Sequence, residues 1–380
     1  MSQGIIERSS ASYYSQIHLA PKGDGKKRFC IDFKKLNDCT DPASWPVPNI
    51  REMFVRLGTH KSSVFGVMDL TSGYHQAPMS FAARIFTAFI AFCGVFHYLR
   101  LPFGPKRAPS YFQEMMAAVV LAGLIYFICE IYLDDCIVHA SDNLTFISRL
   151  ELIFKRFEKH KIILKPGKCR FGLSEVEFCG RVISKEGISV SDKKKGQVLD
   201  FPLPVYMKQL KSFLGLANYS RPHVPHHSEV ARPLHAMLNG YSRGKLLVWT
   251  VELKASFHEL QRLINECPTM YFVDPDAQVY VHTDASDYGI GGYMFQIFDS
   301  VERPCAFVSK SLNETQIRWS TIQKEAYGIF FTCRELNPLL RDRHFILRTD
   351  HKNLLFLHES FNAMIQRWFM SLLELDFTLE

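Results

Sequence analysis

The stretch that decides the fold is FICEIYLDDCIV, residues 127–138. Two apolar, strand-like runs, 127–131 and 136–138, meet there at the paired acids Asp134 and Asp135. The pattern predicts a β-hairpin with both carboxylates at its turn. Asp is also common in ordinary turns, because it tolerates left-handed dihedral angles, and an ordinary turn is the competing interpretation.

A third acid favours a catalytic interpretation of this hairpin. Asp69 ends the apolar run 64–68, so a neighbouring strand could bring it beside Asp134 and Asp135. Three gathered carboxylates repel one another unless cations neutralise them. Two Mg²⁺ ions about 3.5–4 Å apart would do so, and would activate a 3′-hydroxyl and stabilise a pyrophosphate leaving group. The three acids therefore predict a nucleotidyl transferase site.

A second set of acids lies near the C-terminus. Asp284 ends the strand-like run 279–283, Glu325 lies in the helix-like stretch 314–336, and Asp350 follows the predicted strand 344–349. Singly, they could be a turn residue, a solvent-facing residue and a helix cap. Together, acids on two strands and an adjacent helix predict another two-metal site, here for phosphodiester hydrolysis.

Composition limits the class of protein. The chain has 380 residues, of which 47% are hydrophobic and 22% charged, as expected for a globular protein of two or three domains. Its longest uncharged apolar run, 115–129, is shorter than the ~18–20 residues of a bilayer span. The first ten residues have no signal-peptide pattern, and the ten cysteines form no CxxC pair. We therefore expect no membrane association, secretion, zinc site or disulfide framework.

The positive charge is concentrated in one segment. Residues 155–195 hold 12 Lys or Arg against five Asp or Glu, and the net charge of the whole chain is +7. Such a block suits a polyanion, although a solvated surface is the commoner explanation of a charge run. Proline- and glycine-rich segments suggest boundaries near 190–205 and 273.

Over almost its whole length the chain resembles the reverse transcriptase and RNase H segment of gypsy-type LTR retrotransposon polyproteins. The motifs that carry the resemblance occur in the family's order: RFCIDFKKLN (28–37), MDLTSGYHQ (68–76), LPFG (101–104), YLDD (132–135), KCRF (168–171), FLGLANY (213–219), TDAS (283–286) and TDH (349–351).

The resemblance implies an α+β right-hand polymerase, with fingers, palm and thumb, followed by an α/β RNase H-like domain. It places the fingers and palm at 1–190, the thumb or connection at 191–272 and the RNase H-like domain at 273–380. The hairpin at 178–184 is similar to the primer grip, and 208–219 to the thumb helix that tracks the duplex. The family's fourth RNase H carboxylate would lie beyond Glu380, so we expect this domain to be C-terminally incomplete and weak or inactive.

The resemblance also implies the site residues. The polymerase metal ligands are Asp69, Asp134 and Asp135 with the Leu70 carbonyl, and the RNase H ligands are Asp284, Glu325 and Asp350. Each site is expected to take two Mg²⁺, with Mn²⁺ as the alternative ion. The incoming nucleotide is expected to be bound by these residues: Lys22 and Arg28 on the triphosphate, Tyr74 as the steric gate, and Phe103 and Gly104 under the nascent base pair.

The function that follows is RNA- and DNA-directed DNA polymerisation, with an RNase H domain for RNA/DNA hybrids. Its partners would be an RNA template, a DNA primer, dNTPs, and a second copy or other polyprotein products. The expected location is cytoplasmic, in a virus-like particle, or nuclear. The alternative is an inactive or domesticated element fragment that binds nucleic acid or protein. The histidines at 223, 226 and 227 are expected to be surface or packing residues rather than metal ligands.

Overall fold

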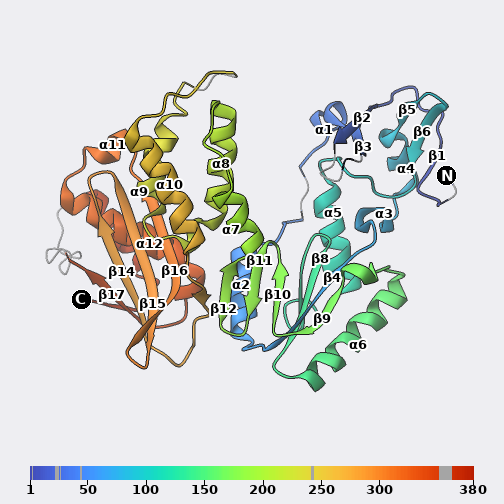
Figure 1. Cartoon of the computed structure of the whole chain (residues 1–380). Helices are drawn as coiled ribbons and strands as arrows, with labels where there is room; N and C mark the ends of the chain where they lie inside the picture. The colour runs from blue at the N-terminus through green and yellow to red at the C-terminus, as the bar shows by residue number, and fades with distance from the viewer. Residues whose placement is uncertain (2, 22–24, 26, 43–44, 241–243, 351–361) are drawn as a thin grey trace. The chain divides into compact units, whose positions relative to one another are not determined.

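The computed structural model contains the predicted hairpin as the antiparallel strands β7 (Cys129–Tyr132) and β8 (Asp135–Ala140) (Figure 1). Strand β4 (Val64–Asp69) pairs antiparallel with β8, and their register sets Asp69 opposite Asp135. Strand β9 (Arg170–Leu173) completes a sheet in the order β7-β8-β4-β9. Pairing between segments far apart in sequence thus brings the third acid to the hairpin.

The structure describes residues 1, 3–21, 25, 27–42, 45–240, 244–350 and 362–380. They divide into two units, Met1–Cys179 and Gly180–Glu380. The three-part division at 190 and 272 remains a prediction.

The first unit adds a three-stranded sheet and a hairpin to the sheet that bears the acids. The three-stranded sheet has the order β1-β6-β5, and β2 pairs antiparallel with β3. These strands are β1 (Ile6–Arg8), β2 (Gln16–Pro21), β3 (Lys27–Asp32), β5 (Phe89–Ala91) and β6 (Gly94–Tyr98), and β10 (Glu175–Phe178) ends the unit.

Two longer helices of this unit start at side-chain caps. The Asn49 side chain accepts a hydrogen bond from the Arg51 N–H and starts α2 (Ile50–Thr59), and Asp142 accepts from Thr145 and starts α6 (Asn143–His160). The shorter helices are α1 (Lys34–Asp38), α3 (Gly73–Gln76), α4 (Phe81–Arg84), η1 (Ile85–Thr87), α5 (Ala108–Glu114), η2 (Met115–Val120) and η3 (Pro166–Lys168). Phe146, Ile153 and Phe157 of α6 are buried in the core beside the sheet.

The second unit begins with a small sheet and a group of helices. The small sheet is formed by β11 (Arg181–Ser184), β12 (Gly187–Val190) and β13 (Met270–Tyr271). The helices are α7 (Asp192–Leu199), α8 (Met207–Ser220), η4 (Arg221–His223), α9 (His227–Ala236) and α10 (Val251–Asn265). They share an apolar core that includes Phe213 and Phe257.

A five-stranded sheet in the order β16-β15-β14-β17-β18 follows. Strands β14 (Val279–Ala285), β15 (Gly289–Phe298) and β16 (Val301–Ser311) are antiparallel, whereas β17 (Phe345–Thr349) and β18 (Phe377–Leu379) extend the sheet in parallel. Helices α12 (Thr321–Leu340) and α13 (Ala363–Leu372) pack against each other and contribute to its core. This is the predicted α/β module.

One sequence expectation for this module needs correction. The helix-like stretch 314–336 is two helices, α11 (Glu314–Ile317) and α12, because Ser320 and Gln323 form a capping box that starts a new helix. Helix α12 then continues to Leu340, past the predicted end at 336.

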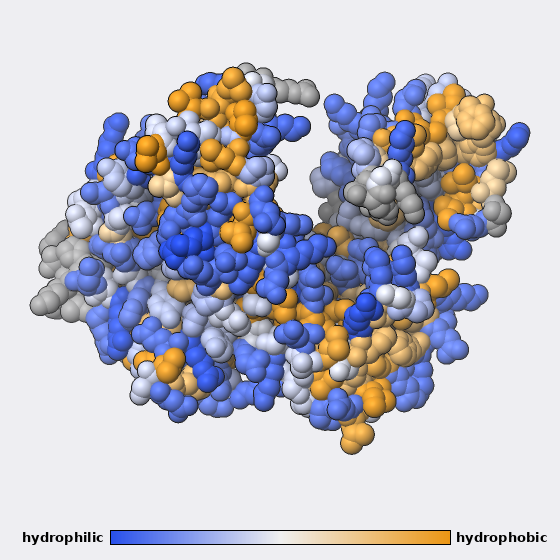
Figure 2. All heavy atoms as spheres, viewed as in Figure 1, coloured by the Kyte–Doolittle hydropathy of each residue, from blue (hydrophilic) through white to orange (hydrophobic). Residues whose placement is uncertain are grey.

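The surface of the first unit carries exposed apolar side chains. Figure 2 shows hydrophobic residues gathered in the region of α6 and β9, where Ile147, Phe154 and Phe171 are exposed. No helix in the described part of the chain combines the length and hydrophobicity that a membrane span would need.

Candidate active sites

The structure brings together the three acids predicted at the first site. Asp69 ends β4 opposite Asp135 at the start of β8, and Asp134 precedes Asp135 in the turn. Burial raises the pKa of Asp135, and the charges of Asp134 and Asp69 raise it further. Mutual repulsion at one end of the sheet is the electrostatic condition under which carboxylates bind cations.

A lysine partly neutralises this cluster. Lys168 Nζ donates to Asp69 Oδ2 at 2.7 Å, and the hydrogen bond to Asp69 raises the lysine pKa. The segment that carries Lys168 is tied to the cluster by its backbone, because the Lys165 N–H donates to the Asp69 carbonyl at 2.9 Å. The motif KCRF contains this residue, but sequence reasoning assigned it no role; its positive charge in a motif beside three acids was the available signal.

A buried glutamine supports the turn of the hairpin and was also missed as a site residue. Gln113 on α5 is fully buried; its Oε1 accepts from the Leu133 N–H at 2.8 Å, and its Nε2 donates to the Ile131 carbonyl at 3.2 Å. Leu133 has a positive φ of 56°, a conformation that is uncommon for a leucine. The side chain of Gln113 therefore helps to hold the turn that presents Asp134 and Asp135.

The predicted nucleotide-pocket residues Tyr74, Phe103 and Gly104 lie close together. The ring of Tyr74 stacks on Phe112 with centroids 5.0 Å apart and lies 4.6 Å from the ring of Phe103, which is exposed. Burial and, second, the charge of Asp134 raise the pKa of Tyr74. Gly104 has φ +113°, and a Cβ there would lie 3.0 Å from the Phe33 ring, so the loop requires glycine.

Three other predicted residues are less completely described. Leu70 follows Asp69 and forms an isolated bridge with Leu164. Arg28 lies in β3, paired with Ala20, and the structure describes only its backbone. Lys22 lies outside the described residues.

The second predicted set also converges. Asp284 lies in β14, Glu325 in α12, and Asp350 directly after β17, which pairs parallel with β14. One carboxylate oxygen from each lies within 4.8 Å of the others. In the described part of the chain, this is the one group of three or more acidic, histidine or cysteine side chains whose oxygen, nitrogen or sulfur atoms lie close enough together to hold a metal ion. Asp69, Asp134 and Asp135 are neighbours by strand register but do not form so close a group, and neither do the histidines at 223, 226 and 227.

Glu325 is the buried member of this cluster. It is 4% exposed, and its Oε2 has no hydrogen-bond partner among the described residues. Burial, followed by the charges of Asp350 and Asp284, raises the Glu325 pKa to about 7. An unpartnered buried oxygen in an all-oxygen donor set fits a hard divalent cation such as Mg²⁺.

Each of the two sites lies in a segment of the chain that matches a known protein family. Residues 20–194 match the family described as reverse transcriptase (RNA-dependent DNA polymerase), and 274–375 match the RNase H-like domain found in reverse transcriptase. The retrovirus-related Pol polyprotein from transposon 297 of Drosophila melanogaster is 31% identical over 100% of this chain and 36% of its own length. That from transposon gypsy of the same species is 30% identical over 97% of this chain and 37% of its own length. The chain thus spans little more than a third of these relatives.

Solved structures resemble the fold at low sequence identity. The foamy viral protease-reverse transcriptase dRH in complex with double-stranded DNA has a TM-score of 0.83 and 21% identity, covering 100% of this chain and 67% of its own. The foamy viral protease-reverse transcriptase in complex with an RNA/DNA hybrid has a TM-score of 0.81 and 20% identity, covering 99% and 51%. The predicted fold class, a reverse transcriptase fold followed by an RNase H-like domain, is confirmed.

Proposed function

The chain belongs to the reverse transcriptase and RNase H-like family of retrotransposon Pol polyproteins, and from this premise we propose that it copies RNA and DNA templates into DNA. The observation that carries the proposal is the meeting of Asp69, Asp134 and Asp135 at one end of the β4–β8 ladder. The substrates would be a primed template and dNTPs.

The first site suits nucleotidyl transfer. Asp69, Asp134 and Asp135, with the Leu70 carbonyl, would hold two Mg²⁺ ions, which when bound activate the primer 3′-hydroxyl and neutralise charge on the leaving pyrophosphate. The primer 3′-oxygen forms a bond to the α-phosphorus, the bond from that phosphorus to the bridging oxygen of the β-phosphate breaks, and pyrophosphate leaves. The protein's task is to align these groups.

The residues around the acids would select and orient the nucleotide. The buried ring of Tyr74, fixed between Phe103 and Phe112, would clash with a ribose 2′-hydroxyl and so favour deoxynucleotides. Arg28 would bind the triphosphate through its planar guanidinium, with Lys22 beside it. Phe103 and Gly104 would lie under the nascent base pair.

A second activity, cleavage of the RNA strand of a hybrid, is favoured by the convergence of Asp284, Glu325 and Asp350. These acids would hold Mg²⁺, or Mn²⁺ in its place. We propose that cleavage supported by these three acids is weak.

Primer extension on poly(rA)/oligo(dT) with Mg²⁺ tests both activities when the RNA strand is labelled. We expect the wild type to extend the primer and Asp134→Asn/Asp135→Asn to lose extension by at least about two orders of magnitude, since the acids hold the ions. Glu151→Gln/Glu158→Gln removes two exposed acids from the same unit and should leave extension unchanged.

Three outcomes would contradict the proposals. Extension that survives in the double Asp variant would exclude the carboxylate site. A wild type that binds duplex in a salt-sensitive way without extending it would favour the alternative, a binding module derived from an element. Disappearance of the labelled RNA, sensitive to Asp284→Asn, would show strong rather than weak cleavage.

A further inference from the structure

The loop 101–104 carries two of the residues proposed to contact the nucleotide, and we call it the LPFG loop. Its first end is bonded to α3, the helix that carries Tyr74, and to the residue that follows this helix. The Leu101 N–H donates to the Ala77 carbonyl at 3.0 Å, and the Leu101 carbonyl accepts from Nδ1 of His75 at 3.1 Å. This end of the loop therefore cannot leave α3 without breaking two hydrogen bonds.

The imidazole of His75 is itself held by the rings around it. It stacks on the buried ring of Tyr98 in β6, with centroids 6.0 Å apart, and it meets the Phe103 ring edge-on at 5.6 Å. Burial lowers the pKa of His75, so the ring is neutral at pH 7. Because a carbonyl oxygen can only accept, we assign the proton of the neutral ring to Nδ1. His75 is thus a fixed donor to the loop.

The other end of the loop is bonded to a side chain of α1. Asn37 Nδ2 donates to the Gly104 carbonyl at 3.0 Å, and Asn37 Oδ1 accepts from the Lys106 N–H at 2.6 Å. The Lys106 ammonium group adds a third bond, to the Thr40 carbonyl at 3.1 Å. Helix α1 directly follows β3, the strand that contains Arg28. One amide group therefore ties the LPFG loop to the segment that carries a proposed triphosphate ligand.

Between its two ends the LPFG loop contacts the ring of Tyr74. The Phe103 ring lies 4.6 Å from the Tyr74 ring, and Phe112 of α5 stacks on Tyr74 at 5.0 Å. Phe103 is exposed, so the packing that it gives to Tyr74 depends on where the loop holds it. A ring that can tilt excludes a 2′-hydroxyl less strictly than a fixed ring, because discrimination by a clash requires a wall that does not yield.

We propose that His75 and Asn37 are positioning residues that hold the LPFG loop against Tyr74 and thereby set the discrimination between deoxynucleotides and ribonucleotides. This inference rests on the proposed function, which supplies the nucleotide as substrate and Tyr74 as the steric gate. Each of the two residues acts through the backbone of the loop. Without either one, Phe103 can move and the Tyr74 ring can tilt, so the penalty for a 2′-hydroxyl falls.

The experiment measures kcat and KM of the full chain for dATP and for ATP on poly(rU)/oligo(dA) with Mg²⁺. His75→Phe keeps an aromatic ring but removes the donor to Leu101. Asn37→Asp keeps the shape of the side chain but replaces the Nδ2 donor with an acceptor. Both positions are only half-buried, and thermal melts of all variants check folding.

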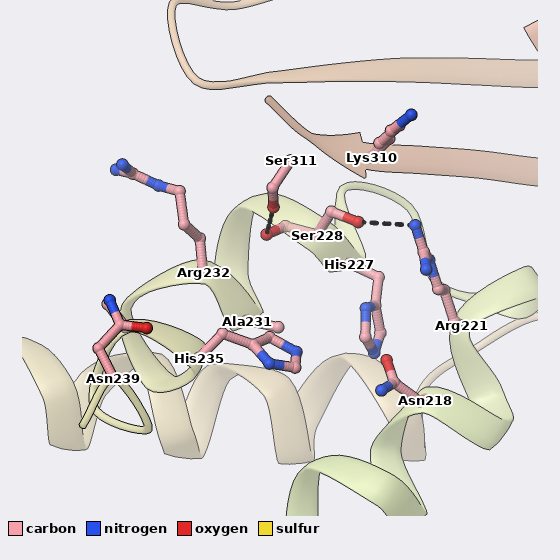
Figure 3. Close-up of a pocket in the computed structure, with 11 residues that line it drawn as sticks. Asn218, Arg221, His227, Ser228, Ala231, Arg232, His235, Asn239, Lys310 and Ser311 are labelled. Atoms are coloured by element: carbon pink, nitrogen blue, oxygen red, sulfur yellow. Dashed lines mark hydrogen bonds between the residues drawn. The ribbon is translucent and has the colours of Figure 1, made fainter. Parts of the chain in front are cut away.

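Each variant has a matched control. His60→Phe removes a hydrogen bond of the same kind in the same unit, between a ring nitrogen and the Tyr126 carbonyl at 3.1 Å. Asn239→Asp makes the same chemical change as Asn37→Asp at an exposed position in the second unit. Asn239 lines a pocket of about 440 Å³ between α9 and β16 (Figure 3). Neither control touches the LPFG loop.

We expect His75→Phe and Asn37→Asp each to lower the ratio of kcat/KM for dATP to kcat/KM for ATP by roughly three- to tenfold, because the loss of one hydrogen bond is worth a factor of this size. The two controls should keep the wild-type ratio. The ratio compares two substrates on one enzyme, so a lower amount of folded protein or a weaker affinity for the duplex leaves it unchanged.

An unchanged ratio in the folded His75 and Asn37 variants would overturn the inference, even if extension with both nucleotides falls to the same extent. A lower ratio in the controls as well would also overturn it, because the effect would then not depend on the loop. A wild type that extends no primer with dATP would overturn the proposed function, so the two failures are distinguishable.

Discussion

At the residue scale, Lys168 sets the charge balance of the first carboxylate cluster. Its ammonium group contacts Asp69 at 2.7 Å, so a cation that binds this oxygen must break the ion pair. We predict that Lys168→Ala binds Mn²⁺ up to roughly fivefold more tightly, since exposed ion pairs contribute about 0.2–1 kcal/mol. Free Mn²⁺ followed by electron paramagnetic resonance measures the affinity.

The control for this prediction is Lys165→Ala. It removes the same charge from the same segment, but the Lys165 side chain makes no contact with the acids in the described structure. An affinity that is equal in Lys168→Ala and wild type would mean that the ion pair does not compete with the metal.

At the scale of elements, the contact between β15 and α12 places Glu325. A Cβ on Gly292 would lie 2.4 Å from Thr332 Cγ2 on α12, whereas one on Gly291 would meet no heavy atom within 4 Å. We predict that Gly292→Ala lowers the free energy of unfolding by about 1–3 kcal/mol through overpacking. Gly291→Ala should change it by less than about 0.5 kcal/mol. Urea denaturation measures both, and equal effects of the two substitutions would contradict this account.

At the scale of the whole molecule, buried imidazoles make the folded chain sensitive to acid. Burial lowers the pKa of His139 in the first unit and of His223 in the second to about 3, and that of His227 to about 4. In the unfolded chain these histidines have pKa values near 6.5. Between about pH 6.5 and pH 4 they therefore take up protons in the unfolded chain but not in the folded one. The contribution of these histidines to the free energy of unfolding is therefore fully present above about pH 6.5, and it is lost as the pH decreases toward 4.

This acid sensitivity can be measured by urea unfolding at pH 7 and pH 5 at constant ionic strength. We expect each imidazole to contribute a loss on the order of 1–2 kcal/mol. His139→Gln should reduce the difference between the two pH values, and His226→Gln, at an exposed position, should not. Equal stability at pH 5 and pH 7 would show that the histidines are already charged in the folded chain.

Much of the local structure could be predicted from periodicity and motifs. The apolar runs around Asp134 and Asp135 predicted the hairpin, and the strand-like run 279–283 predicted β14. The break between α11 and α12 was missed, because a capping box inside an otherwise helical pattern is a short signal. The roles assigned to Tyr74, Arg28 and Lys22 stay predictions.

By itself, the sequence determined which segments form strands and helices and which acids stand at their ends, since these depend on side-chain period and on near neighbours in the chain. Only the tertiary structure decided which distant groups meet. The Asp69 contact with Lys168, 99 residues away, and the burial of Glu325 are of this kind. Such contacts depend on strand register and helix packing. Register and packing are set by many side chains fitting together at once, and no single segment of the sequence contains that information.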